Sequence, residues 1–475
     1  MIRALVFGTV LCAFTTTATS AEVVKLAIVP AVEPRPALKY QLLPKFIDRR
    51  PGNAAPRYAK AMLTYRPTPE IDAEINRLLQ LPIEEFGTDE VQKQVAAFGA
   101  SAVVEELRRA ACLQSCEWEL PLREQSVFHI LLPEVQEMRR LGRYVALRAR
   151  CELVEGRYGD ATATLAVGYA MARHVAESPT LINGLVGHAL AGQMDRILLD
   201  FAAARGAPSL YAALTFQPRP LVDIRPGIEG EMYSLQMTFP KLFAAADSEA
   251  VWNANLQDVI RGFSQVAELL STGADPPQSW SAVFDHMKTI GEAKTRRREL
   301  QQFLIACGRK AAEVEQMSDA QIAVEFTALK FDDLRDETFC WVSQPYPIAK
   351  DRLDAALKRL ATAEGSDREL IPLAKLMLPA VTSVARIAAR GERRVQVARL
   401  IEALRLYVAS HDGRLPSKIE ELQTATPTAL IDSITGRPWD YKLIDGKATL
   451  SLPEDGGGDK PATLTYEITV AGAEK

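Results

Sequence analysis

Apolar residues recur every three or four positions through most of residues 69–391, and this spacing places them on one face of an α-helix. One helix is predicted to begin at Thr88, and another covers Pro133–Glu155 and stops at Gly156. Their apolar positions are Val91, Val95, Phe98, Ala102 and Leu107 in the first, and Val135, Met138, Leu141, Val145 and Ala149 in the second. The middle of the chain is therefore predicted to be almost entirely helical.

Two consecutive helices are predicted next, Gly159–Glu177 and Leu181–Ala204, because Ser178-Pro179 ends the first and lets the second begin. The connection is short, so these helices should lie antiparallel. The turn Glu155–Ala161, followed by a helix rich in small residues, resembles part of a tetratricopeptide (TPR) unit. No repeat of about 34 residues accompanies it. The prediction is a mainly α fold, either a helical-hairpin (TPR-like) solenoid or an irregular bundle.

The two ends of the chain have a different pattern. Residues 22–68 are irregular and proline-rich, and Val23–Val29 suits an extended piece. Near the C-terminus, Glu392–Ser410 predicts an amphipathic helix, and Asp445-Gly446 is a strong hairpin signal between two strands. The predicted strands are Trp439–Ile444, Lys447–Leu452 and Thr463–Val470. A small α+β module, a helix plus a three-stranded antiparallel sheet, is therefore expected at residues 392–475, after a helical domain at 69–391.

The first residues have the three parts of a secretory signal peptide: a charged start at Arg3, an apolar stretch Ala4–Phe14, and a small-residue segment that ends at Ala21. Cleavage is expected after Ala21, with Ser20 as the alternative. The apolar stretch of about 11 residues is much shorter than the roughly 20 that span a bilayer. Residues 1–21 are thus predicted to be removed from an exported protein, periplasmic, extracytoplasmic or secreted, and no membrane span is expected afterwards.

The amino-acid composition and net charge bear on whether the partner is a nucleic acid. The chain has 475 residues, of which 48% are hydrophobic and 24% charged, as in ordinary globular proteins. Lys and Arg number 56 against 60 Asp and Glu, which gives a net charge of -4. This balance argues against a nucleic-acid partner.

Five cysteines remain once the signal peptide is gone. Cys112 and Cys116 are spaced by one helical turn where a helix should end, so they could form a disulfide in an exported protein. The alternative is that both are small buried apolar side chains, which is common for free cysteine. The sequence leaves these two interpretations open.

Sequence motifs of the large enzyme classes are absent from the chain. The best candidates for chemistry are His174 and His188, on the two arms of the predicted hairpin, with Asp195 two turns beyond His188. Such a trio could bind a metal or act as acid and base. The alternative is that the imidazoles fill close helix crossings. The prediction is therefore no catalytic residue, no metal site and no cofactor.

Six short strings, taken together, resemble an uncharacterised family of secreted bacterial helical proteins, over residues of about 36–245. They are Leu38–Pro44, Pro51–Ala55, Cys116–Trp118, Met138–Arg150, Leu181–Gly187 and Pro220–Arg225. The resemblance implies an exported helical protein and carries no activity and no site residues.

The C-terminal part resembles the globular domain of type IV pilin-like and pseudopilin proteins. The matching residues are Leu404–Pro416, Asp432, Thr435–Trp439 and Tyr441. A true pilin begins with its helix, fully apolar at the start, whereas here the helix is internal and follows the charged stretch Asp351–Glu369.

These observations favour an exported helical scaffold or binding protein whose partner is another protein of the cell envelope. The alternative is an envelope enzyme, a metal-assisted hydrolase that uses the histidines and carboxylates of the helical hairpin.

Overall fold

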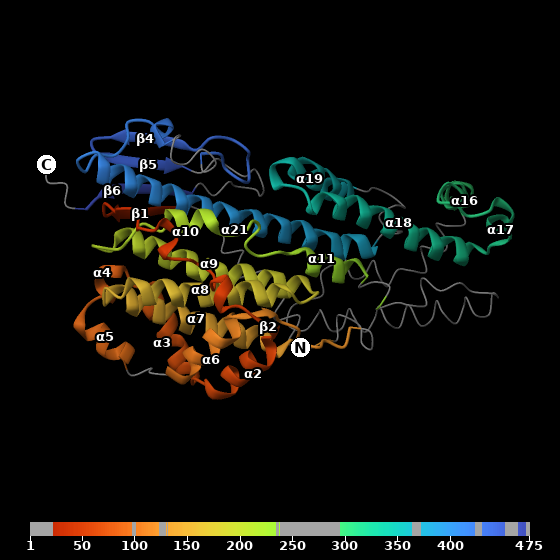
Figure 1. Cartoon of the computed structure of the whole chain (residues 1–475). Helices are drawn as coiled ribbons and strands as arrows, with labels where there is room; N and C mark the ends of the chain where they lie inside the picture. Colours follow the sequence, from red (N-terminus) through yellow and green to blue (C-terminus); the bar gives the residue numbers. More distant parts are fainter. Residues whose placement is uncertain are drawn as a thin grey trace. The chain divides into compact units, whose positions relative to one another are not determined.

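The computed structural model describes residues 22–96, 101–122, 130, 132–233, 237, 295–362, 372–422, 430–451 and 464–471. The fold is mainly α with a small mixed sheet that contains the C-terminal strands, which confirms the predicted class (Figure 1). The chain divides into two compact units. The larger unit holds the described residues of 22–118, 132–227 and 386–471, so it combines parts of all three predicted segments, 22–68, 69–391 and 392–475.

Three long helices form the centre of the larger unit: α7 (Pro133–Val154), α8 (Tyr158–Ala176) and α9 (Leu181–Ala203). Pro133 occupies the first turn of α7, where its missing N–H costs nothing. Gly156 turns the chain into α8 with φ +74°, a left-handed conformation that favours glycine. Thr180 caps α9 by accepting the backbone N–H of Asn183 at 3.2 Å. The chain thus folds back twice, the second time at the predicted hairpin of α8 and α9, and α7, α8 and α9 pack against one another.

Shorter elements complete the larger unit. The helices are α2 (Ala55–Thr64), α3 (Pro69–Gln80), α4 (Ile83–Phe86), α5 (Asp89–Ala96), α6 (Ser101–Ala111), α10 (Tyr211–Phe216) and the start of α11 (Arg225–Met232). The 3-10 turns are η1 (Ala37–Lys39), η2 (Phe46–Asp48) and η6 (Ile419–Leu422). A two-stranded parallel sheet joins β2 (Arg50–Asn53) to β3 (Leu113–Ser115).

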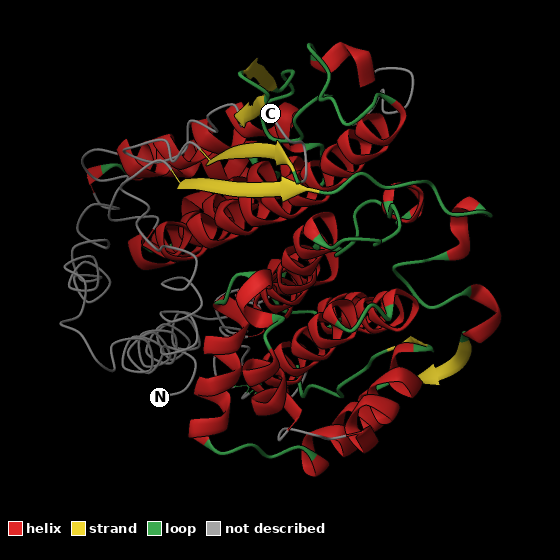
Figure 2. Ribbon diagram, turned by 90° about the vertical axis from the view of Figure 1, so that its left-hand side faces the viewer, coloured by secondary structure: helices red, strands yellow, loops and turns green. Residues whose placement is uncertain are grey.

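The main sheet has the order β1-β6-β5-β4, with β1 (Glu22–Ile28), β4 (Asp440–Ile444), β5 (Lys447–Ser451) and β6 (Leu464–Val470). The three predicted C-terminal strands are present and antiparallel. The prediction of three strands was incomplete, however, because β1 adds a fourth strand that runs parallel to β6. Figure 2 shows that the sheet packs on helices. Its apolar face contacts α21 (Pro372–Ser410). Ile28, Leu450 and Ile468 pack there with Leu400 and Leu404.

The smaller unit lies within Ile228–Ala385, apart from a short piece around residue 120. It contains α16 (Arg297–Ala306), α17 (Ala311–Gln316), α18 (Asp319–Val342), α19 (Tyr346–Thr362) and the start of α21. Ser318 and Gln321 form a capping box at the start of α18. One apolar cluster joins α16, α17 and α18 through Leu304, Val314 and Phe326. No helix of the described ranges has the length and apolar character needed to cross a bilayer.

Candidate binding site

A cavity of about 300 Å³ lies between α5 and α7 in the larger unit. Positions three or four apart on α7 share one helix face, and this face supplies most of the cavity wall. The lining residues are Tyr144, Leu147, Arg148, Cys151 and Glu155 from α7 and its C-terminal end, and Gln92, Val95 and Ala96 from α5. The wall therefore combines an aromatic ring, aliphatic side chains and charges of both signs.

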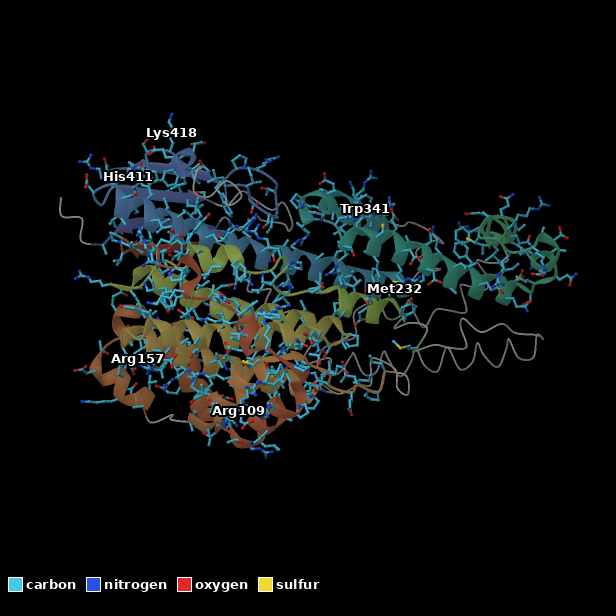
Figure 3. All side chains as sticks on the ribbon, in the orientation of Figure 1. Arg109, Arg157, Met232, Trp341, His411 and Lys418 are labelled. Carbon is cyan, nitrogen blue, oxygen red and sulfur yellow. The ribbon has the colours of Figure 1, made fainter. Side chains whose placement is uncertain are left out.

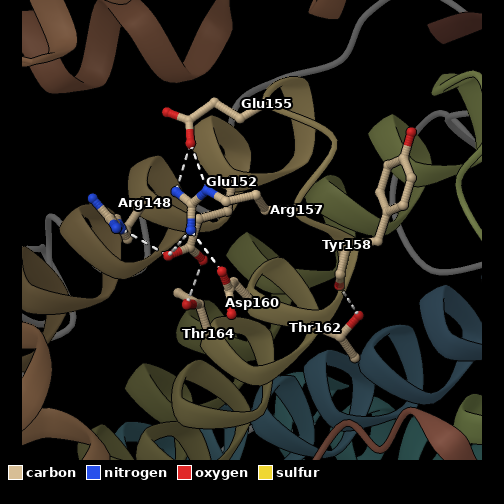
Figure 4. Close-up of polar contacts among 8 residues, drawn as sticks. All are labelled: Arg148, Glu152, Glu155, Arg157, Tyr158, Asp160, Thr162 and Thr164. Atoms are coloured by element: carbon tan, nitrogen blue, oxygen red, sulfur yellow. Dashed lines mark hydrogen bonds and ion pairs between the residues drawn. The ribbon is translucent and has the colours of Figure 1, made fainter.

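Arg148 is held in place beside this cavity by Glu152, whose side chain is only 1% exposed. The Arg148 Nε donates to Glu152 Oε1 at 2.8 Å, and the Thr164 hydroxyl donates to Oε2 at 2.6 Å (Figure 4). The Arg157 Nη1 also lies 3.7 Å from Glu152 Oε1. A buried carboxylate needs such partners to offset its lost hydration. The buried Glu152 is thus the ion-pair partner of Arg148, whose own side chain is 45% exposed.

Arg157, at the turn between α7 and α8, pairs with Glu155, which lines the cavity. Its guanidinium lies 2.6 Å from Glu155 Oε2 and 2.7 Å from Asp160 Oδ2. Figure 3 labels Arg157 at the end of the helices where α7 leads into α8. Glu155 and Arg148 both line the cavity, so one acid and one base border the same space.

Cys151 lines the cavity but is poorly suited to nucleophilic chemistry. Burial raises the pKa of its thiol to about 12, and the nearby Glu155 carboxylate contributes in the same direction. The thiolate is the reactive form of cysteine, so the side chain is protonated and inert near neutral pH.

His174 links three elements of the larger unit. Its Nε2 lies 3.0 Å from the Leu113 carbonyl and its Nδ1 lies 2.8 Å from the Tyr58 hydroxyl. A carbonyl only accepts, so the neutral ring carries its proton on Nε2 and accepts the Tyr58 proton at Nδ1. Burial lowers the pKa of His174 to about 4. Both nitrogens are occupied in joining α2, α8 and β3.

His188 and Asp195 lie on α9 and meet α21 at Arg394. The Arg394 Nε donates to Asp195 Oδ2 at 3.0 Å, and its Nη2 donates to the His188 backbone carbonyl at 3.4 Å. The Tyr169 hydroxyl donates to the other Asp195 oxygen at 2.9 Å. Burial raises the pKa of Asp195, although Arg394 opposes this effect, and burial lowers the pKa of His188 to about 3.

Of the predicted trio, His188 and Asp195 thus both contact Arg394. The His174 ring instead contacts the Tyr58 hydroxyl of α2 and the Leu113 carbonyl of β3. No group of three or more His, Cys, Asp or Glu side chains with the geometry for a metal ion occurs in the part of the chain that the structure describes.

Cys112 and Cys116 are both unpaired in the structure. The interval between them is not the helical turn that the sequence suggested, because α6 ends at Ala111 and β3 (Leu113–Ser115) separates the two cysteines. Burial raises the pKa of the Cys116 thiol, and the backbone N–H of Cys116 is bound by Glu177 Oε2 at 2.7 Å. The disulfide remains a prediction.

Sequence reasoning missed a set of buried ion pairs in the larger unit. The shortest contacts are Arg393–Asp432 at 2.6 Å, Arg405–Glu402 at 2.7 Å and Arg150–Asp200 at 2.8 Å. The side chain of Arg405 is fully buried and also donates to the Ala207 carbonyl at 2.9 Å. A pair three residues apart on a helix, such as Glu402 and Arg405, has the same sequence pattern whether it faces water or the core.

Comparison of the chain with known protein families, with curated proteins and with solved structures gives no match.

Proposed function

We propose that this chain is an exported helical binding protein of the cell envelope, and that the cavity between α5 and α7 holds a segment of a partner protein. The observation that carries the proposal is the cavity of about 300 Å³ with a paired cation, a paired carboxylate and an aromatic ring in its wall. Export rests on the signal-peptide pattern of residues 1–21.

The chemistry of the wall suits a peptide segment. Tyr144, Leu147 and Val95 offer apolar contact, and Arg148 and Glu155 offer hydrogen bonds to groups of either polarity. Ligand pockets combine apolar wall residues with a few placed polar groups that set orientation. Helical-hairpin arrays commonly use such surfaces to bind proteins, which supports a protein partner by analogy.

The C-terminal module supports a place in the envelope by a second analogy. Its helix-then-strands order is that of the pilin-like domains which residues 404–441 resemble. We propose that it is a pilin-like module whose helix is internal to the chain, unlike the N-terminal helix of a true pilin.

A matched pair of variants tests the proposed site. Ala96 is exposed and lines the cavity, whereas Lys93 is exposed on the same helix and does not line it. Ala96→Trp should fill the cavity and Lys93→Trp should leave it open. We expect affinity capture of the tagged protein from cross-linked cell envelopes to recover a stoichiometric protein partner with wild type and Lys93→Trp, and to lose it with Ala96→Trp. Equal recovery with both variants, or no partner with wild type, would contradict the proposal.

A further inference from the structure

An adjacent pair of large apolar side chains projects from the turn η2, in the segment that leads into β2. Phe46 is 85% exposed and Ile47 is 87% exposed, the highest values among the large apolar side chains that the structure describes. Single exposed apolar residues are common on protein surfaces and need no explanation. Two neighbours presented together on an exposed turn form what we call the apolar tip, Phe46 and Ile47, which a binding surface can cover.

Hydrogen bonds hold this turn in shape. The Asp48 N–H donates to the Lys45 carbonyl at 2.9 Å, and the Arg49 N–H donates to the Phe46 carbonyl at 3.1 Å. The Arg49 Nε donates back to the Pro44 carbonyl at 3.0 Å. The apolar tip is thus presented by a closed turn.

Both ends of the turn are attached to the body of the larger unit. Leu42, on the N-terminal side, is 1% exposed. On the C-terminal side, the Arg50 N–H donates to the Cys112 carbonyl at 2.8 Å, at the start of the β2–β3 pairing. The exposure of the apolar tip therefore follows from the fold, and docking would need little ordering of the chain.

Positive charge surrounds the apolar tip. Lys45, Arg49 and Arg50 are exposed, and Asp48 is the one acid within Lys45–Arg50, so three cations and one carboxylate give a net charge of +2. Arg173 of α8 adds a further cation nearby. Its pKa is lowered by burial and then by repulsion from Arg49.

We propose that this turn docks the protein on an anionic lipid surface, with Phe46 and Ile47 in the boundary between headgroups and acyl chains and with the flanking cations against the headgroups. Peripheral attachment to a bilayer requires both inserted apolar groups and basic residues, because either one alone gives only marginal membrane binding. A stable protein–protein interface instead needs about 800 Å² on each partner, more than two apolar side chains supply. The inference rests on this turn and is independent of the cavity.

Vesicle sedimentation tests the proposal, with the processed protein and vesicles of phosphatidylcholine alone or mixed with phosphatidylglycerol. We expect binding to the anionic vesicles that weakens as salt is raised, because screening shortens the reach of the charges. Phe46→Ser with Ile47→Ser should weaken this binding about tenfold or more, since both insertions are lost. Lys45→Gln with Arg50→Gln should weaken it and reduce its dependence on salt.

The control pair is Leu63→Ser with Ile444→Ser, which removes two apolar side chains that are 65% and 66% exposed elsewhere in the same unit. It should bind as wild type does. Failure of the wild type to bind anionic vesicles at low salt would overturn the proposal. Binding of the Phe46/Ile47 variant to anionic vesicles as strong as that of wild type would also overturn it. A third contrary result would be that the wild type binds no vesicles while the Phe46/Ile47 variant loses a cross-linked protein partner. Circular dichroism confirms that each variant is folded, and the charge variant provides a second test on an intact apolar tip.

Discussion

At the scale of single residues, the close packing of α9 on α21 depends on the absence of a side chain at Gly391. A Cβ at this position would lie 2.8 Å from His188 Nδ1, and the His188 ring is buried. Gly391→Ala should gain about 1 kcal/mol of helix propensity and lose more through overpacking, for a net destabilisation of about 1–2 kcal/mol. The measurement is urea unfolding. Gly159→Ala, on α8, meets nothing within 4 Å and should leave stability unchanged or raised. Equal effects of the two variants would exclude the close contact.

His188 also predicts a pH dependence. Its folded pKa of about 3 lies below the roughly 6.5 of an unfolded histidine, so its contribution to stability is fully present above pH 6.5 and is lost as the pH falls. The loss is about 1.4 kcal/mol per pH unit, because the unfolded chain binds a proton that the folded protein cannot. Between pH 6.5 and 4.5 the unfolding free energy of wild type should fall by about 2 kcal/mol more than that of His188→Asn. Parallel curves would show that His188 is not buried in its neutral form.

At the scale of elements, Asp432 fixes the loop before β4 to α21. Its carboxylate accepts two hydrogen bonds from Arg393, at 2.6 and 2.7 Å, and two from Thr435, both at 2.8 Å. Asp432→Ala leaves the buried Arg393 guanidinium without this counter-ion and should cost about 3–5 kcal/mol in thermal or urea unfolding. Asp440→Ala removes an exposed partner of Lys442 and should cost less than about 1 kcal/mol. Similar costs for both would mean that the Asp432 pair is solvated.

At the scale of the whole molecule, the two described ends of the chain are joined by the parallel pairing of β1 with β6. Ile28 is fully buried, and its carbonyl accepts the Ala471 N–H at 2.9 Å. Ile28→Ala should lower the unfolding free energy by about 2–4 kcal/mol and speed hydrogen exchange in β6. Val23→Ala, at a position 47% exposed, should change neither. Unaltered exchange in β6 with Ile28→Ala would show that β1 does not complete the sheet.

Features of this fold could be predicted from the sequence where the residues that determine them are close together in the chain, and could not where those residues are far apart. The helices and the Asp445-Gly446 hairpin were predictable because their signals are local, in apolar spacing and turn residues. The pairing of β1 with β6 was not, since strands more than 400 residues apart carry no mutual local signal. The cavity was not predicted: the apolar face expected for the helix Pro133–Glu155 holds Val135, Met138, Leu141, Val145 and Ala149, and none of these lines it. Val95 and Tyr144 each lie on a predicted helix, but their meeting at one cavity depends on how those helices pack.

The central claim is that the cavity between α5 and α7 binds a protein of the cell envelope. The most direct measurement places a small diazirine amino acid at Val95, inside the cavity wall, or at Lys93, outside it, and activates it in intact cells. The account predicts a single protein cross-linked from position 95, absent from position 93, and lost when Ala96→Trp is added. The same products from both positions, or none from position 95, would contradict it.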